Sequence, residues 1–286
     1  MKKLLAAILL LALSWNATAA ISYKQGAVSA ENYGGTTSTA SFGTLPSSGD
    51  SVLVAVAYRD TVAPSITDNQ TGNTYTAVQT LLWSGQVSVS IFWCPSITSP
   101  TGTFTVTSTS AAMEWLTIAD VSGLSASTDN GNAADSGGPI STYTITAAGA
   151  NTNANDFVFA ILSINSNSGT FGLVVPSTGY TQISNTDGNN YPVEVAYKIV
   201  SAIETSSADW SWTTASTNGA IAAIETFKAA GSASCSNTGY TQAGTYVVPT
   251  PSSTVVYRQD GNFGTVPCSG SGASNSYYQH GTFGVN

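Results

Sequence analysis

Two stretches of the chain, 106 residues apart, carry the same pattern and decide the fold. Residues 49–58 read GDSVLVAVAY and residues 155–164 read NDFVFAILSI. Each begins with a turn residue and an aspartate and continues as a largely apolar run. A short apolar run that is bounded by turn residues is typical of a strand covered on both faces. We therefore expect each stretch to form a central strand of a β-sandwich.

The match between the two stretches extends along the chain and indicates an internal duplication. Each further matched segment has strand chemistry, with Gly, Pro, Asn and Asp between the segments. The pattern predicts an all-β fold, a jelly-roll-type β-sandwich built from an internal duplication. The domain covers 21–230, with repeat units at about 26–125 and 135–230. The further matched pairs, at offsets of 104 to 106, are Asn73–Val78 with Thr178–Ile183, Val89–Trp93 with Val193–Tyr197, Thr103–Val106 with Asp209–Trp212, and Ile118–Val121 with Ile224–Phe227.

Two arrangements of the copies fit this pattern. The copies form either the two halves of one large jelly roll or two tandem sandwiches. The join at 122–141 is rich in Gly, Asn, Asp, Ser and Ala, which fits a linker or a long crossing loop. We favour one jelly roll, because neither copy shows clear extra edge strands that would complete it.

The two ends of the chain are expected to lie outside the sandwich. Residues 1–20 combine a positive start, an apolar stretch and a small-x-small pattern, which predicts a signal peptide. The apolar stretch is shorter than the ~20 residues of a membrane span. We therefore expect a secreted or cell-surface protein, with the periplasm as the alternative and no integral membrane association. Residues 231–286 are expected to form a small C-terminal β module.

The cysteines fit an oxidising compartment. Three of them follow the leader, and an odd count suggests one disulfide and one free thiol. Cys235 and Cys268 bracket the C-terminal segment, and we predict that they form a disulfide that staples this small module. Cys94 lies in a strand run and is expected to be a buried, inert thiol.

The composition excludes nucleic acid as a partner. Charged residues make up 8% of the chain, against ~25% in an average soluble protein. Without the leader, five cations oppose fifteen acids, which gives a net charge of about −10. Neutralising phosphates requires clustered Lys and Arg, and no two of these cations are neighbours. Hydroxyl and amide side chains in their place are typical of adhesins, fibre proteins and glycan-binding modules.

Catalytic residues are sparse. His280 is the one histidine of the chain, so a histidine-rich metal centre is excluded. No Gly-x-Ser-x-Gly elbow marks a nucleophile. Glu114 shares strand parity with Leu116 and is the candidate for an inward-facing general acid. Glu194 alternates with Val193 and is expected to face solvent. The chain therefore leans away from an enzyme, and no other catalytic residue is assigned.

Asp-rich segments offer oxygen ligands for structural calcium. The candidates are Asp129, Asp135 and Asp187, because calcium takes six to eight oxygen ligands. The alternative is an ordinary turn, since turns use the same residues for backbone reasons. No other cofactor is expected.

Aromatic side chains are the candidates for ligand binding, because their rings stack on the apolar faces of neutral sugars. Trp83 lies in an expected loop and has no apolar counterpart in the other copy. Trp210 and Trp212 match an apolar pair in the first copy and are expected in the core. Three further rings are candidates for exposed ligand contacts: Tyr191, Tyr277 and Tyr278.

Four segments of the chain resemble those of a known type of domain. They are the run at 49–57, TDN at 67–69, GNTY at 72–75 and the closing AAIETFK at 222–228. Over about 26–230 the chain resembles an uncharacterised β-sandwich domain that recurs in bacterial secreted proteins and phage structural proteins. The resemblance implies the fold and an exported or virion-surface setting, and it implies no catalytic residues.

Three hypotheses for the function follow. The first is an exported, non-catalytic recognition or adhesion protein for neutral carbohydrate or another cell-surface polymer. The second is a structural subunit of a surface appendage or phage-like particle, which would self-associate. The third is a carbohydrate-active enzyme that uses a carboxylate pair, Glu114 with a loop aspartate.

Overall fold

The computed structural model describes residues 20–32, 34–82, 87–165, 173–174, 179–186, 191–213 and 218–230. Within these ranges the chain forms antiparallel β-strands and turns and no helix, which confirms the predicted all-β class. The chain divides into two compact units, Met1–Gly231 and Ser232–Asn286. The predicted signal peptide, the Cys235–Cys268 pair and His280 lie outside the described residues.

Fifteen strands are described, in two series. The first copy contains β1 (Ser22–Val28), β2 (Gly35–Ser41), β3 (Ser51–Tyr58), β4 (Ser65–Asp68), β5 (Thr76–Leu81), β6 (Ser88–Cys94) and β7 (Thr105–Ser122). The second copy contains β8 (Leu124–Asp135), β9 (Thr142–Thr146), β10 (Phe157–Ile164), β11 (Leu173–Val174), β12 (Thr181–Thr186), β13 (Val193–Ile199), β14 (Ser207–Trp212) and β15 (Ala220–Ala229).

The strand order is the same in both copies, although the first copy forms one bonded sheet of seven strands and the second copy forms two sheets. In the first copy we call the path β1-β7-β3-β6-β5 the large sheet, and we call β2 and β4 with the first half of β7, which they flank, the small sheet. In the second copy the large sheet is β8-β15-β10-β13-β12 and the small sheet is β9-β14-β11. The single long strand β7 corresponds to β14 and β15 together. The antiparallel sheets of both copies are those of a β-sandwich, as the sequence predicted.

The join between the copies is largely a strand. Leu124–Asp135 forms β8, which pairs with β15 at the edge of the large sheet, as β1 pairs with β7. An edge strand keeps one side in solvent, so its residues are as polar as those of a loop. This is why the composition of the segment suggested a linker.

The repeated turn-residue–aspartate motif has the same structural role in both copies. Gly49 has a φ of 91° and Asn155 a φ of 71°. Glycine and asparagine reach this left-handed region at the lowest cost. The aspartate that follows is buried in both copies. Asp50 Oδ2 accepts a hydrogen bond from the Ser47 amide at 2.8 Å, and Asp156 Oδ2 accepts one from the Asn153 amide at 3.3 Å. The motif therefore fixes the entry into β3 and β10.

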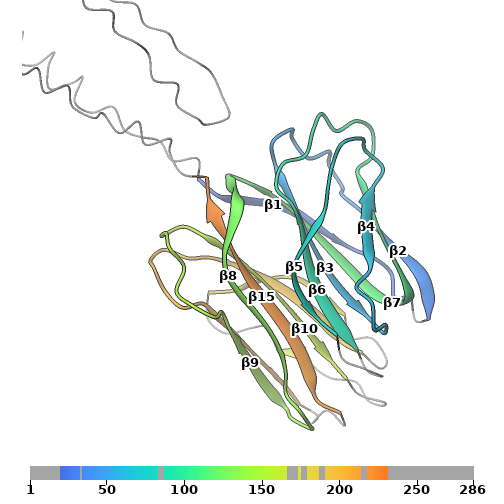
Figure 1. The fold of residues 1–286 in the computed structure, drawn as a ribbon, viewed down its shortest axis with the longest axis vertical. Coiled ribbons are helices and arrows are strands. Elements are labelled where there is room, and N and C mark those ends of the chain that lie inside the picture. The colour runs from blue at the N-terminus through green and yellow to red at the C-terminus, as the bar shows by residue number, and fades with distance from the viewer. Residues whose placement is uncertain are drawn as a thin grey trace, which may run out of the picture. The chain divides into compact units, whose positions relative to one another are not determined.

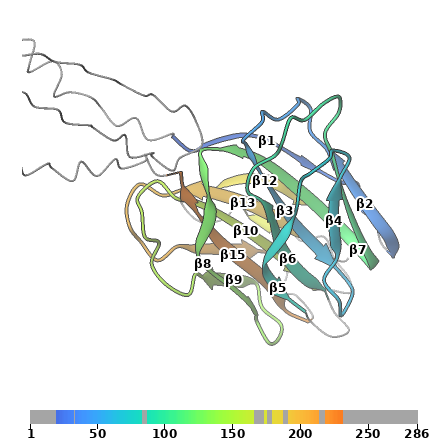
Figure 2. The same cartoon turned by 45° about the horizontal axis from the view of Figure 1, so that its top comes forward.

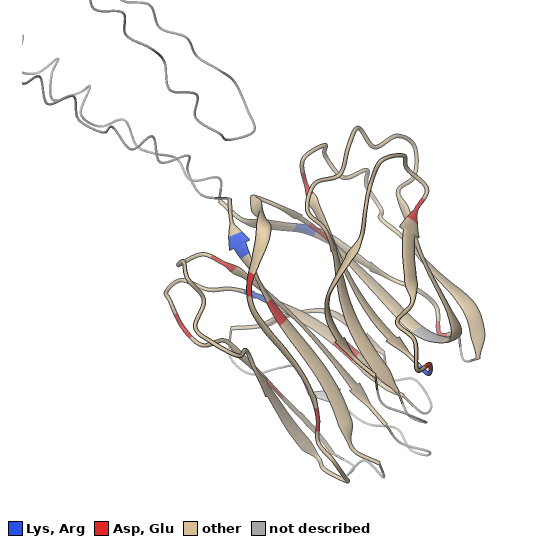
Figure 3. Ribbon diagram, in the orientation of Figure 1, with Lys and Arg blue, Asp and Glu red and all other residues tan. Residues whose placement is uncertain are grey.

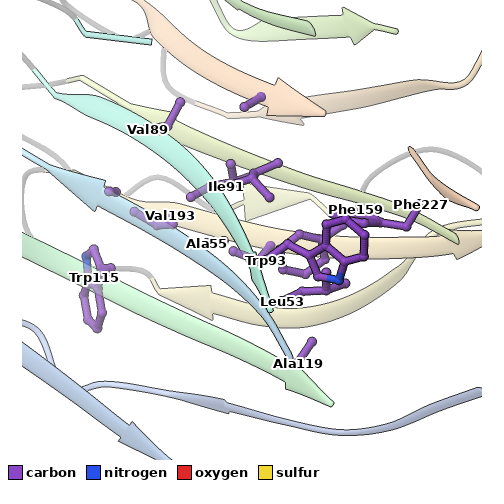
Figure 4. Packing of buried hydrophobic residues seen from close by; sticks show 14 of the residues in the cluster. Leu53, Ala55, Val89, Ile91, Trp93, Trp115, Ala119, Phe159, Val193 and Phe227 are labelled. Atoms are coloured by element: carbon purple, nitrogen blue, oxygen red, sulfur yellow. The ribbon is translucent and has the colours of Figure 1, made fainter. Parts of the chain in front are cut away.

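The two large sheets pack face to face and form the central core (Figure 4). Trp93 lies edge-on to Phe227 at 5.3 Å between ring centroids. Tyr23 stacks on Tyr197 at 4.4 Å. At the margins β1 lies against β12 and the equivalent strands β8 and β5 lie against each other, as in an approximately twofold arrangement of the copies. Aliphatic side chains from both copies fill the space between them: Leu53, Val89, Ile91, Ile161, Val195 and Ala223.

Two outer cores complete the stack. One lies between the large and small sheets of the first copy, and Val54, Phe104 and Leu116 belong to it. The other lies at the equivalent place in the second copy and contains Trp210 and Trp212, as the repeat predicted. The described part of the first unit therefore has four layers, with the small sheets outermost (Figures 1 and 2).

Candidate ligand-binding faces

The outer surface of the small sheet in the first copy is a lattice of hydroxyl side chains, which we call the first hydroxyl face. Side chains alternate along a strand, so Ala40 and Val106 point into the core while their neighbours point to solvent. Every outward position of these strands, from β2 across β7 to β4, carries threonine or serine in the regular part of the sheet. The members are Thr37, Thr39, Ser41, Thr105, Thr107, Thr109, Ser65 and Thr67.

The hydroxyl side chains stand in ranks because β7 lies between β2 and β4. Thr107 pairs with Thr39 on one side and Thr67 on the other. Thr109 is flanked in the same way by Thr37 and Ser65. Neighbouring strands in any sheet lie about 4.8 Å apart, and outward residues repeat about every 6.7 Å along a strand. The face is therefore a regular grid of hydroxyl and methyl groups.

The first hydroxyl face carries no charged side chain (Figure 3). The one charged residue of β4 is Asp68, which is half-buried and turned to the loop below. Its Oδ2 accepts hydrogen bonds from Tyr75 Oη at 2.8 Å and from Asn73 Nδ2 at 2.9 Å. Threonine is stiff at χ1, so ordering these side chains on a ligand has a low entropy cost.

The second copy repeats the arrangement on β9 and β14. Thr142, Thr144 and Thr146 point outward from β9, opposite Ser211, Asp209 and Ser207 of β14. We call these six residues the second hydroxyl face. Asp209 places one carboxylate among five hydroxyls. A carboxylate accepts stronger hydrogen bonds than a neutral oxygen does.

The segment 67–75 forms a hydrogen-bonded loop beside the first hydroxyl face. Asp68 Oδ1 accepts a hydrogen bond from the Gln70 amide at 2.9 Å. Asn69 Nδ2 donates to the Thr103 carbonyl at 2.7 Å, and Asn69 Oδ1 accepts from the Thr105 amide at 3.0 Å. These bonds tie the loop to the start of β7 and so set the position of the central strand of the face.

Replacing Asp68 by alanine is expected to lower the free energy of unfolding by about 2 kcal/mol, because it removes the acceptor of three hydrogen bonds and leaves partly buried donors unpaired. Urea unfolding followed by tryptophan fluorescence measures the change. Glu31→Ala, at an exposed position, is the matched control and should leave the midpoint in place. Equal midpoints for the two variants would contradict the structural role of Asp68.

Among the strand carboxylates the structure describes the side chains of Glu194 and Glu225, and these two do not form a pair. Glu114 lies in β7, and its side chain is outside what the structure describes. Glu194 is fully buried, so the prediction that it faces solvent is wrong. It faces the interior between the sheets of the second copy, which strand parity on one sheet does not reveal. Burial raises the pKa of Glu194 to about 8.

Glu225 lies on the opposite face of the same sheet. It points into the junction between the copies, where Gln79 Nε2 donates a hydrogen bond to its Oε2 at 2.7 Å. Burial raises the pKa of Glu225 to about 7. Because a sheet separates Glu194 from Glu225, these two carboxyl groups do not form a catalytic pair.

The aspartates considered for calcium have other partners. Asp129 accepts a hydrogen bond from the Thr152 amide and lies 3.9 Å from Lys228 Nζ. Asp135 Oδ1 accepts one from the Gly137 amide at 2.8 Å, as in an ordinary turn. Six residues of extended strand, roughly 20 Å, separate the two aspartates, so they do not share one ion. Within the described ranges no three His, Cys, Asp or Glu residues gather as a metal site would need. Asp187 lies outside these ranges.

The aromatic candidates are placed as follows. Trp83, Tyr277 and Tyr278 lie outside the described residues, and their roles stay predictions. Tyr191 is only 6% exposed and has the Arg59 guanidinium 5.1 Å from its ring centroid. It belongs to the central core, so the expectation of an exposed ring at this position is not met. Cys94 is buried as predicted, and burial raises the pKa of its thiol.

Sequence reasoning missed both hydroxyl faces. The signal is present as alternating threonines in TFTVTST at 103–109 and TYTIT at 142–146. Threonine favours strands in general, so the alternation alone predicts a strand and not a site. Only the pairing of β2, β7 and β4 shows that three such rows stand side by side.

Comparison of the chain with models of protein families, with curated proteins and with solved structures finds no match. No helix in the described ranges is long and apolar enough to cross a membrane. The function is therefore inferred from the residues of the chain itself.

Proposed function

We propose that this is an exported, non-catalytic recognition or adhesion protein that binds neutral carbohydrate through the first hydroxyl face. The observation that carries the proposal is the grid of eight threonine and serine side chains on a sheet face without charge. The partner is a neutral glycan or another neutral cell-surface polymer, and nucleic acid is excluded by the scarcity of cations.

The chemistry of the face suits a sugar polymer. Sugars present hydroxyl groups beside C–H surfaces, and threonine offers a hydroxyl beside a methyl group. One hydrogen bond contributes a net free energy of about 0.5–1.5 kcal/mol to binding, and the total becomes substantial when several rows of hydroxyl side chains contact one polysaccharide chain. A neutral polymer also avoids the free-energy cost of removing water from charges.

The proposed setting rests on the sequence of the leader and on the fold. Residues 1–20 have the pattern of a secretory signal peptide, so we place the protein at the cell surface or outside the cell, with the periplasm as the alternative. We assign each copy to the jelly-roll type. In support, the first strand pairs with the last and the third strand lies beside it in both large sheets.

A structural subunit of a surface appendage or phage-like particle is the second candidate. It is supported by the family resemblance and by the two flat hydroxyl faces, which suit contact between copies of the chain. Sedimentation velocity distinguishes the candidates, because a subunit should form large assemblies without any glycan, while a recognition protein should sediment as one chain.

The direct test is binding of the mature protein to a glycan array and to insoluble neutral polysaccharides. Thr107→Lys places a strongly hydrated cation at the centre of the first hydroxyl face and should weaken binding at least about tenfold. Thr181→Lys, on an exposed position of β12 outside both faces, is the matched control and should bind as the wild type does.

Two outcomes would contradict this placement of the site. Binding of Thr107→Lys as tight as that of the wild type would exclude the first hydroxyl face. Binding that is lost in Trp83→Ala and retained in Thr107→Lys would move the site to the loop aromatic.

A further inference from the structure

The two hydroxyl faces lie on opposite sides of one rigid stack. The inner side of each small sheet packs against the large sheet of the same copy. The core between them contains Val54 in the first copy and Trp210 in the second. The large sheets are joined by the central core, which includes the Trp93–Phe227 contact. The outward sides of the small sheets therefore point away from each other (Figure 1).

Sheets that pack face to face lie about 10 Å apart. Three such spacings place the two hydroxyl faces on the order of 30 Å from each other. One straight polymer chain that lies on the first face does not reach the second. Whatever binds the second face is therefore a separate chain or a separate part of a bent one.

The second copy has kept the chemistry of the first. The core residues differ between the copies, as at Phe104 and Trp210 or Val106 and Trp212. On β9 and β14 five of the six outward positions are nevertheless hydroxyl side chains, with Thr142, Thr144 and Thr146 forming an unbroken row on β9. Asp209 adds a strong acceptor for pairs of sugar hydroxyls.

We propose that the protein cross-links neutral polysaccharide, with the second hydroxyl face as a second binding site that faces the opposite way. This inference rests on the proposed function of the first face and adds a second site and a bridging role. The duplication explains the arrangement, because the approximately twofold arrangement that packs the large sheets together also turns the small sheets outward in opposite directions.

Bead agglutination tests the bridging role. The probes are latex beads coated with hydroxyethyl cellulose, with mannan or with dextran, which are all neutral. The wild-type protein should bind at least one kind of bead and agglutinate it. Thr144→Lys should still bind those beads through the first face and lose agglutination. Thr107→Lys should bind them at least about tenfold more weakly, through the second face alone, and should also lose agglutination. The combined variant should not bind. Thr181→Lys should agglutinate as the wild type does.

The outcomes separate the two proposals. If the wild type binds no beads, the proposed function fails and the inference fails with it. If the wild type binds without agglutination, or if agglutination survives Thr144→Lys, the bridging role is overturned while the first face stands. Sedimentation of the free protein as one chain shows that agglutination does not come from a dimer. Thr146→Lys repeats the test on β9 if Thr144→Lys does not fold.

Discussion

Replacing Gly131 by valine is expected to lower the free energy of unfolding by about 1–2 kcal/mol, because a side chain at this position between the copies must displace Glu225 and Gln79. A Cβ atom at Gly131 would lie 2.1 Å from Glu225 Oε2 and 2.3 Å from Gln79 Nε2. These two side chains are hydrogen-bonded to each other across the junction, so moving them breaks that bond. Urea unfolding followed by tryptophan fluorescence measures the loss.

Gly26 is the counterpart of Gly131 in the first copy, 105 residues earlier. A Cβ atom there would lie 2.6 Å from Ile183 Cγ2, across the same junction on its other side. Gly26→Val should therefore be destabilising by a similar amount. Gly138→Val is the matched control, because a Cβ atom at Gly138 meets no atom within 4 Å. If all three variants unfold at one midpoint, the close packing of the copies is contradicted.

Glu194→Gln is expected to stabilise the protein at pH 8 and to leave its stability unchanged near pH 4.5. Burial raises the pKa of Glu194 from 4.5 to about 8, and neither carboxyl oxygen has a hydrogen-bond partner among the described residues. The folded protein then holds this proton more tightly than the unfolded chain does. Stability therefore falls as the pH rises from 4.5 to about 8.

The size of this effect follows from the shift. One pH unit corresponds to about 1.4 kcal/mol, so the whole window is on the order of 5 kcal/mol for Glu194 alone. Glu225 contributes in the same direction up to about pH 7. Urea unfolding at pH 5, 6, 7 and 8 should show a steeper fall for the wild type than for Glu194→Gln. Glu31→Gln, at an exposed position, should follow the wild type, and equal slopes for all three proteins would contradict the buried charge.

The sequence predicted the elements whose signal is local. The apolar runs at 51–58 and 157–164 are fully buried strands, because a strand covered on both faces needs apolar residues at every position. Trp210 and Trp212 were placed in the core by their match to an apolar pair, and they are buried.

The elements with weaker signals were missed. β2 and β9 are short strands with one polar side, so the small sheet of each copy was invisible in the composition. The polar edge strand β8 of the large sheet looked like a linker for the same reason. Because the small sheet of the second copy was not foreseen, nothing was expected to cover Glu194, and its side chain was expected to face solvent. The hydroxyl faces depend on which strands pair, and pairing between residues as distant as Thr39, Thr67 and Thr107 is set by packing of the whole domain.

The most direct test of the central claim is an NMR titration of the isotope-labelled mature protein. The ligand is a neutral oligosaccharide from the polymer that binds best in the bead series. Binding through the hydroxyl faces predicts that amide shifts concentrate on β2, β4 and the first half of β7, and on β9 and β14. Shifts confined to 83–86 or to other loops, with Thr39, Thr107 and Thr144 unmoved, would contradict the account.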